Sequence, residues 1–159
     1  MAPEVLSLPR QLHTVGGLTG LLEQMRKRFG DTTGIELAIT PDEAMLFRSD
    51  PADDQTKLLY RFHGGWGDAT RKPRDDKDIP ADLGAFDVNA IAGVLRGAPE
   101  TLGIKHDDVS EVFVDIDHVQ DPTGVGALEL LVKVTKSSGG DGYIYLDNAG
   151  NIKRVEFPE

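Results

Sequence analysis

The chain has 159 residues, a length that suits one domain or two small units sharing a core. Its net charge of -10 argues against the basic stripe that nucleic acid requires. It has no cysteine, which excludes disulfide frameworks, thiolate metal sites and cysteine nucleophiles. Hydrophobic residues make up 39% and charged residues 28%, so we expect a folded chain without a nucleic-acid partner.

No run of about 18 apolar residues occurs, so we expect no part of this chain to insert into a membrane. The opening stretch MAPEVLSLPRQLHTVGG lacks a charged region followed by an apolar run, and it does not have the pattern of a signal peptide. A leader or anchor trimmed from a longer product would leave the same sequence. The compartment therefore stays open at this point, as does the oligomeric state.

A helical pattern comes first in chain order, in GGLTGLLEQMRKRFG. Its apolar residues recur at spacings of three and four and form one stripe: Leu18, Leu21, Leu22, Met25 and Phe29. A glycine in the left-handed conformation is a common end for a helix, so the pattern predicts that this helix stops at Gly30.

Three strand patterns follow the predicted helix. Residues 35–40 (IELAIT) alternate apolar side chains with others, which is typical of a strand with two different faces. The turn PDEA leads into residues 45–50 (MLFRSD), and residues 57–63 (KLLYRFH) come next. Residues 69–85 are charged and rich in proline and glycine, and we interpret them as a linker.

A second helical pattern begins after Asp87, which is a suitable N-cap. Its apolar residues lie 73 positions after those of the first helix: Ile91, Val94, Leu95, Ala98 and Leu102. Gly103 matches Gly30 at the same shift. The common spacing predicts that one helix-then-strands unit occurs twice.

Strand patterns also follow the second helix, at residues 111–117, 127–135, 142–146 and 151–157. If their regular apolar positions face the helix, the other face is not purely polar. It carries Phe113, Leu131 and either the pair Tyr143 and Tyr145 or the pair that alternates with it. Such a face needs a cover, which is either the other half of the chain or a partner protein docking on an open sheet.

These patterns together predict an α+β fold of two tandem helix-plus-antiparallel-sheet repeats, with the helices packed on one face of the sheet. The first repeat spans residues 1–68, a charged linker spans 69–85, and the second repeat with its closing hairpin spans 86–159. The two repeats can form one compact domain, in which they share one long sheet.

The stretch GYIYLDNAGNIKRVEF ends the second half in a recognisable way. Tyr143 and Tyr145 alternate along a strand, and Asp147 and Gly150 form a D-x-x-G turn before a short charged strand. The second half, from residue 86 to 157, thereby resembles the PepSY domain. Two such units in tandem also look like the beta-lactamase-inhibitor-protein architecture, although the first half lacks the D-x-x-G hairpin.

This resemblance implies a non-enzymatic module, usually outside the cytoplasm, that binds or restrains another protein, sometimes a peptidase. We therefore expect a protein-binding or regulatory module, the soluble domain of an exported or membrane-anchored protein. Its extracytoplasmic location rests on the resemblance alone. The alternative is a carrier of a small apolar ligand, or an enzyme, with a pocket between helix and sheet.

The sequence predicts no catalytic residue, no metal site and no cofactor. No nucleophile elbow or phosphate-binding motif is present, and no two of the four histidines have metal-ligand spacing. DIDHVQD contains Asp115, Asp117 and Asp121 but lacks the glycine of a calcium loop. We interpret Asp115 and Asp117 as the outer face of a sheet, opposite Lys133 and Lys136 on the neighbouring strand.

Five residues remain as candidate binding residues, because lone aromatics and an apolar second sheet face are typical of interfaces. They are Trp66, Phe113, Leu131, Tyr143 and Tyr145. Trp66 lies in the glycine-rich loop HGGWG, and folding of its ring back onto the core is the alternative.

The centre of the closing hairpin, DNAGN at residues 147–151, raises the question of a cation-binding loop. Only one of its five residues is acidic. Gly150 suits the left-handed position of a short hairpin turn with a bulge, and we therefore predict a turn.

Overall fold

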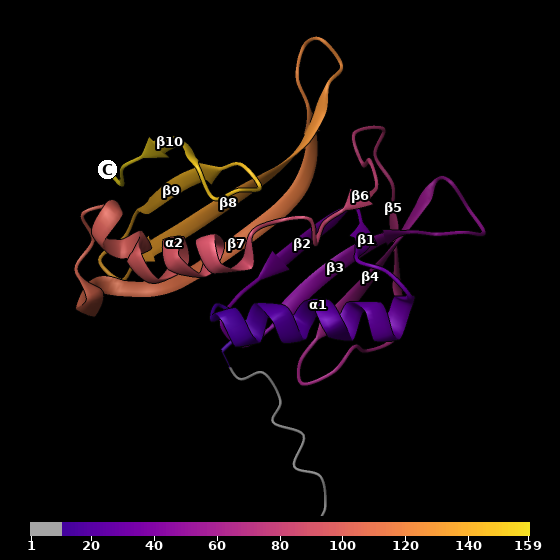
Figure 1. Cartoon of the computed structure of the whole chain (residues 1–159), viewed down its shortest axis with the longest axis horizontal. Helices are drawn as coiled ribbons and strands as arrows, with labels where there is room; N and C mark the ends of the chain where they lie inside the picture. The colour runs from indigo at the N-terminus through magenta and orange to yellow at the C-terminus, as the bar shows by residue number, and fades with distance from the viewer. Residues whose placement is uncertain (1–10) are drawn as a thin grey trace, which may run out of the picture.

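The structure, a computed structural model, describes residues 11–159 (Figure 1). Its helices are α1 (Val15–Phe29) and α2 (Val88–Thr101), and a 3-10 turn, η1, covers His106–Asp108. The strands are β1 (Thr33–Gly34), β2 (Glu36–Ile39), β3 (Ala44–Ser49), β4 (Thr56–Phe62), β5 (Thr70–Pro73), β6 (Ala81–Asp82), β7 (Val109–Gln120), β8 (Gly126–Lys136), β9 (Asp141–Leu146) and β10 (Ile152–Glu156).

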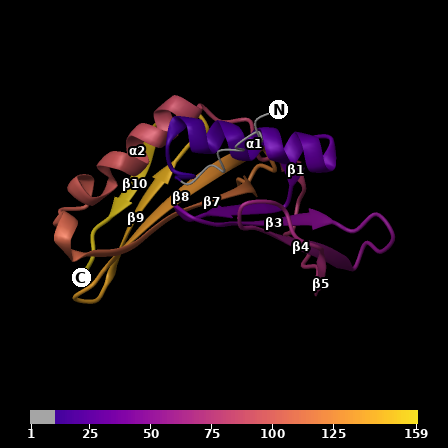
Figure 2. The same cartoon turned by 90° about the horizontal axis from the view of Figure 1, so that it is seen from below.

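Eight of these strands form one antiparallel sheet in the order β10-β9-β8-β7-β2-β3-β4-β5. The short strands β1 and β6 pair separately. Both helices lie on the same side of the large sheet, α2 over the half that contains β7–β10 and α1 over the half that contains β2–β5 (Figure 2). We call the opposite side, over which neither helix lies, the helix-free face.

The predicted fold class, α+β built from two tandem helix-plus-antiparallel-sheet repeats, is wrong. Residues 11–159 are mostly antiparallel β, with ten strands and only two helices, and eight of the strands share one continuous sheet. β2 pairs with β7 from Glu36↔Asp117 to Ile39↔Val114, which joins the two predicted repeats. Alternation along a strand assigns its faces but not its neighbours, and separate repeats would have left the backbone edges of β2 and β7 unpaired.

Part of the predicted linker is regular structure. β5 extends the large sheet beyond β4, and β6 pairs with β1 through Thr33↔Asp82 and Gly34↔Ala81. The segment between the two helical patterns therefore contributes strands to both sheets. The division of the chain into units at residues 68 and 86 stays a prediction.

The two predicted helices are confirmed, and so are the two predicted end signals at Gly30 and Asp87. The Thr14 hydroxyl oxygen accepts the N–H of Gly17 at the start of α1, and Gly30 ends that helix at φ 87°. The Asp87 carboxylate accepts the N–H of Ala90 at the start of α2. Within the described residues, neither helix has the length and the apolar run needed to cross a bilayer.

One hydrophobic core fills the space between the helices and the sheet. The helices supply their predicted stripes, and β2, β7, β8 and β9 supply the alternate positions that face them. Leu21 and Ile91 have no exposed surface, nor do Leu37, Ile116 and Val132 on the sheet below. Because both halves of the sheet contribute to this core, burial of apolar surface holds the halves together.

The closing hairpin is a turn, as predicted. The Asp147 carboxylate accepts the backbone N–H groups of Ala149 and Asn151, and Gly150 adopts φ 87°. These hydrogen bonds lower the pKa of Asp147. The largest contribution comes from the side-chain amide of Asn151, and smaller ones come from the two backbone N–H groups. The turn also rests against the start of α2, since the Asn148 carbonyl accepts the N–H of Asp87 at 2.8 Å.

Candidate functional site

Strand register brings four of the five predicted binding residues together on the helix-free face. Leu131 on β8 lies opposite Tyr145 on β9, and Tyr143 on the same strand lies opposite Lys133. Phe113 on β7 lies opposite the same lysine. All four predicted residues are partly exposed. We call Phe113, Leu131, Tyr143 and Tyr145 the aromatic patch.

Two cations border the aromatic patch. The ammonium nitrogen of Lys133 lies 5.4 Å from the centroid of the Phe113 ring, and the guanidinium carbon of Arg154 lies 4.0 Å from that of Tyr145. Cations over ring faces are attracted by the ring quadrupole.

Trp66, the fifth predicted binding residue, lies away from the aromatic patch. Its ring packs at 5.4 Å from Phe29 at the end of α1 and at 5.1 Å from Phe62, both measured between centroids. Gly64, at φ 76°, lies in the turn that brings Trp66 back beside Phe62 on β4. The structure therefore places this ring against the core on the helix side. Whether any of the five residues binds a partner stays a prediction.

Carboxylates occupy the middle of the helix-free face, next to the aromatic patch. Asp117 lies between Glu36 on β2 and Glu129 on β8, and Asp115 faces Leu131. The expectation that two lysines of β8 stand opposite these aspartates is therefore wrong, because the register of the β7–β8 hairpin places lysines at other levels. Within the described chain, only Glu129 among the four carboxylates forms an ion pair, with Lys153.

Burial and like charge raise the pKa values of two of these groups. The pKa of Asp115 is raised to about 8. The largest cause is burial, followed by a hydrogen bond with Glu36 and by the negative charges of Glu36 and Asp117. Burial, followed by the charges of Glu36 and Glu129, raises the pKa of Asp117. The Oδ1 atom of Asp115 is buried and has no hydrogen-bond partner among residues 11–159. A cation supplied from outside would favour the charged forms of both aspartates.

Residues 11–159 contain no group of three or more histidine, aspartate or glutamate side chains arranged to hold a metal ion. The carboxylates on the helix-free face are spread along strands rather than folded around one point. Their arrangement is better suited to contacts with separate cationic groups on a surface.

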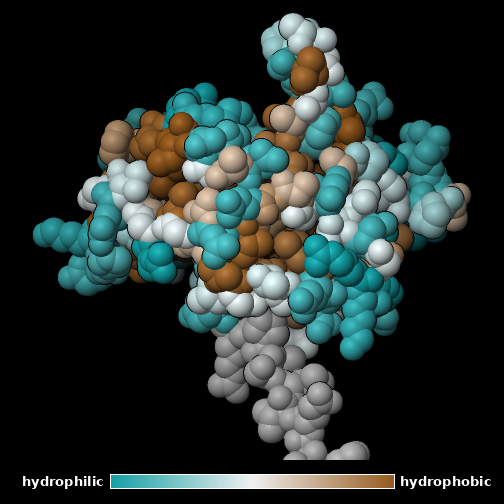
Figure 3. Space-filling view, in the orientation of Figure 1, coloured by the Kyte–Doolittle hydropathy of each residue, from teal (hydrophilic) through white to brown (hydrophobic). Residues whose placement is uncertain are grey.

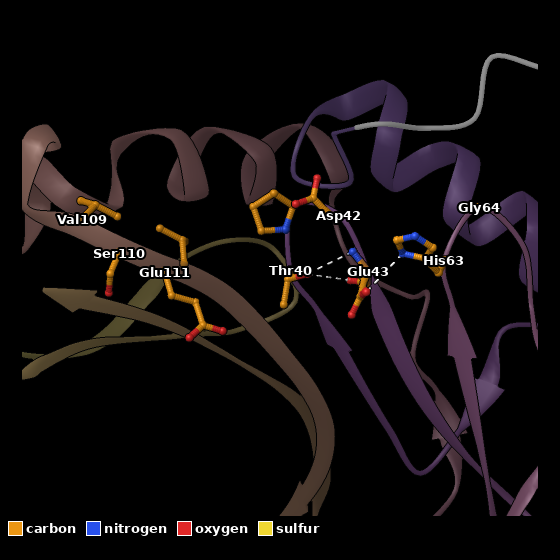
Figure 4. A pocket seen from close by; sticks show the side chains of 10 residues that line it. Thr40, Asp42, Glu43, His63, Gly64, Val109, Ser110 and Glu111 are labelled. Carbon is orange, nitrogen blue, oxygen red and sulfur yellow. Dashed lines mark hydrogen bonds and ion pairs between the residues drawn. The ribbon is translucent and has the colours of Figure 1, made fainter. Parts of the chain in front are cut away.

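A second feature, which the sequence patterns did not predict, is an open depression of about 890 Å³ (Figure 4). It lies where the turn after β2, the end of β4 and the first part of β7 meet, and we call it the notch. His63 Nδ1 lies 3.1 Å from Glu43 Oε1 on one side. Ser110 lies on the other side (Figure 4), so the notch does not pair a hydroxyl nucleophile with a histidine base.

The notch exists because β7 continues past the end of β2. The sequence shows where each strand pattern begins and ends, and β2 stops before a proline. It does not show that β2 and β7 are neighbours. Without that pairing, the difference in length between the two strands does not predict a notch.

No family model matches the chain, and no solved structure matches it. The chain is 50% identical over 159 residues to the uncharacterized protein Rv0048c of Mycobacterium tuberculosis strain H37Rv. It has the same identity to the uncharacterized protein MT0054 of strain CDC 1551. Each match covers 99% of this chain and 55% of the relative, so the chain spans about half the length of the curated relatives it matches.

These relatives carry no assigned function in their names, and the resemblance to PepSY and beta-lactamase-inhibitor proteins stays a prediction.

Proposed function

We propose that this chain is a non-enzymatic protein-binding module that docks a partner on its helix-free face. The single observation that carries the proposal is the aromatic patch, in which four large side chains from three adjacent strands lie together with no helix over them. The proposal concerns this chain alone, and the relatives extend well beyond the matched region.

Large aromatic side chains are typical centres of protein interfaces. Tyrosine in particular supplies much contact area at a low cost in side-chain entropy and has a hydroxyl for hydrogen bonding. Tyr143 and Tyr145 are held by strand pairing on both sides, which keeps them in position before a partner arrives. A rigid patch of this kind limits the entropy lost on binding.

The adjacent carboxylates indicate the chemistry of the partner. Glu36, Asp115 and Asp117 have no cation within ion-pair distance in the described chain, whereas the patch beside them is apolar. A partner surface with apolar side chains around one or more lysine or arginine groups is complementary to both features. Such a partner would also offset the repulsion among the carboxylates.

A cross-linking experiment tests the proposal. With a photoreactive phenylalanine analogue in place of Tyr145, we expect one protein from the source cells to be cross-linked, and none with the analogue at Glu23 on the exposed side of α1. The purified partner should then bind Tyr145→Ala about tenfold or more weakly than the unchanged chain, as expected for loss of a central interface aromatic.

Glu23→Ala serves as the matched control and should leave the affinity unchanged. Raising the ionic strength should slow association, because exposed charge pairs are screened. Circular dichroism of both variants checks that the fold is intact. Equal affinity of the two variants, or cross-links from the α1 position alone, would show that the partner does not use the helix-free face.

A further inference from the structure

The first part of β7 has one edge without a partner strand. On one side β7 pairs with β8 from Val109 to Gln120, with a shift of register, typical of a β-bulge, between Val109 and Glu111. On the other side it pairs with β2 only from Val114 to Asp117. Within the described chain, residues 110–113 therefore have no strand beside them on the β2 side. Backbone N–H and C=O groups at such an edge are a template for another strand.

The turn after β2 explains why this edge is open. The N–H of Thr40 donates to the Glu43 carbonyl at 2.9 Å, and the N–H of Glu43 donates to the Thr40 hydroxyl at 3.0 Å. Pro41, inside the turn, has no N–H with which to continue the ladder. The chain therefore reverses into β3 and leaves the notch beside β7, as Figure 4 shows.

A second, smaller depression adjoins the notch on the helix side. It has a volume of about 340 Å³ and shares Pro41 and Val112 with the notch. Its other walls include Val15 at the start of α1 and Ala92 and Leu95 on α2. Figure 3 shows hydrophobic residues gathered between the two helices on this side of the molecule. We call this depression the interhelix pocket.

The polar groups of the interhelix pocket restrict what it can hold. His13 Nε2 lies 2.8 Å from the Ile39 carbonyl oxygen, and burial lowers the pKa of His13, which keeps the ring neutral at pH 7. Arg96 lines the same pocket and repels a cation. An apolar side chain fits this pocket, and a lysine or arginine does not.

The notch has the opposite charge. Asp42, Glu43 and Glu111 line it, and of these only Glu43 has an ion-pair partner in the described chain, His63. Along β7, Val112 faces the helices whereas Glu111 faces the other way. A strand laid beside β7 alternates in the same manner, so its inward side chain meets the interhelix pocket and its outward neighbours meet carboxylates.

We propose that an extended peptide segment with alternating basic and apolar residues binds in the notch and adds a strand to β7 along residues 110–113. One apolar side chain enters the interhelix pocket, and the flanking lysine or arginine side chains contact Glu111 and Glu43, whose carboxylates point away from the helices (Figure 4). Main-chain hydrogen bonds provide affinity in this mode of recognition, and the side-chain pocket provides specificity. This surface shares only Phe113 with the aromatic patch, and neither Val15 nor Tyr145, the positions that test the two proposals, belongs to both surfaces.

The β5 edge of the sheet is less suited to such pairing. β5 ends in Pro73, which lacks an N–H, and its two preceding residues are Arg71 and Lys72. Charged residues and proline are the usual protection of an edge strand against a second chain. Residues 110–113 contain no proline and adjoin a pocket of defined character, which the β5 edge does not.

The probe for this proposal is a set of fluorescein-labelled pentapeptides of sequence Thr-Lys-X-Lys-Thr, with X as leucine, valine or phenylalanine. At low salt we expect at least one to bind the chain with a Kd of about 10–100 μM, in the range of short peptide segments. Amide NMR signals of Ser110–Val112 should shift, and those of their amides that point to the open edge should exchange more slowly. A copy of the peptide N-methylated on its backbone should not bind.

Two variants of the chain localise the binding. Val15→Trp fills the mouth of the interhelix pocket and should weaken binding at least tenfold, whereas Val125→Trp, at the exposed tip of the β7–β8 hairpin, should not change it. Glu111→Lys should weaken binding about tenfold at low salt. Peptides with glutamate in place of lysine should bind more weakly than the original set.

Several results would overturn the proposal. One is that none of the three peptides binds, because each has the alternation of basic and apolar residues that the proposal requires. Others are shifts confined to the aromatic patch, equal binding by the N-methylated copy, or equal affinity of Val15→Trp and Val125→Trp. Thermal melting of each variant, compared with the unchanged chain, separates loss of binding from loss of fold.

Discussion

Replacing Gly17 by alanine should lower the free energy of unfolding by about 2–4 kcal/mol, because the new methyl group has no room. A Cβ atom at this position would lie 1.8 Å from the Gln11 carbonyl oxygen and 2.8 Å from Leu12 Cα. These are backbone atoms of the turn that precedes α1, and Leu12 within it is fully buried. The methyl group therefore displaces a buried residue rather than a flexible side chain.

Gly16→Ala provides the matched control one residue earlier in the same helix. A Cβ atom there has nothing within 4 Å, and the backbone is helical. This variant should be more stable than the original chain by up to about 1 kcal/mol, because alanine loses less backbone entropy on folding than glycine. Chemical denaturation measures both. Similar changes in the two variants would contradict the close approach of the turn to α1.

Replacing Asp115 by asparagine should stabilise the fold in alkaline solution. The folded-state pKa of Asp115 is about 8, well above the value of about 3.9 expected in an unfolded chain. Between these values the folded chain holds more protons than the unfolded chain, so stability falls as the pH rises through this window. The full contribution of the protonated group is present only below about pH 4.

Asparagine is neutral at every pH, and its amide can donate a hydrogen bond to Glu36. We expect Asp115→Asn to match the original chain near pH 4 and to exceed its free energy of unfolding by about 1–3 kcal/mol near pH 9. Urea denaturation at a series of pH values gives the comparison. The dependence on pH between these points should be flatter in the variant.

Asp121→Asn is the control for this experiment. Asp121 lies in the exposed turn of the β7–β8 hairpin, where the Thr123 hydroxyl and nearby backbone N–H groups lower its pKa. Its replacement should give no gain at alkaline pH, because the charged form of Asp121 is the favoured one. Equal responses of the two variants would show that Asp115 is not held in its protonated form by burial and by its acidic neighbours.

Features that depend on a few consecutive residues were predictable. The stripes of α1 and α2, the N-cap Asp87, the C-terminal stop at Gly30 and the turn at residues 147–151 are all present. Each depends on hydrogen bonds or spacings within about one turn of chain, so the residues that decide it are adjacent in the sequence.

Some of the residues on the helix-free face were also predictable from the sequence. Alternation placed Phe113 and Leu131 on one face, but it left two choices for β9. The register with β8 decides in favour of Tyr143 and Tyr145, because Tyr145 lies opposite Leu131. The register between β7 and β8 puts Glu129, rather than a lysine, opposite Asp117. A period of two specifies a face, and only pairing specifies the neighbour on it.

The sequence by itself thus determined the local elements, the two faces of each strand and the absence of cysteine chemistry. Only the tertiary structure decided that β2 and β7 join all eight strands into one sheet, that Trp66 packs against Phe29, and that a notch opens beside β7. These are contacts between segments far apart in the chain. Side-chain periodicity carries no information about which distant backbone edge completes a ladder, because backbone hydrogen bonds are nearly the same for every residue.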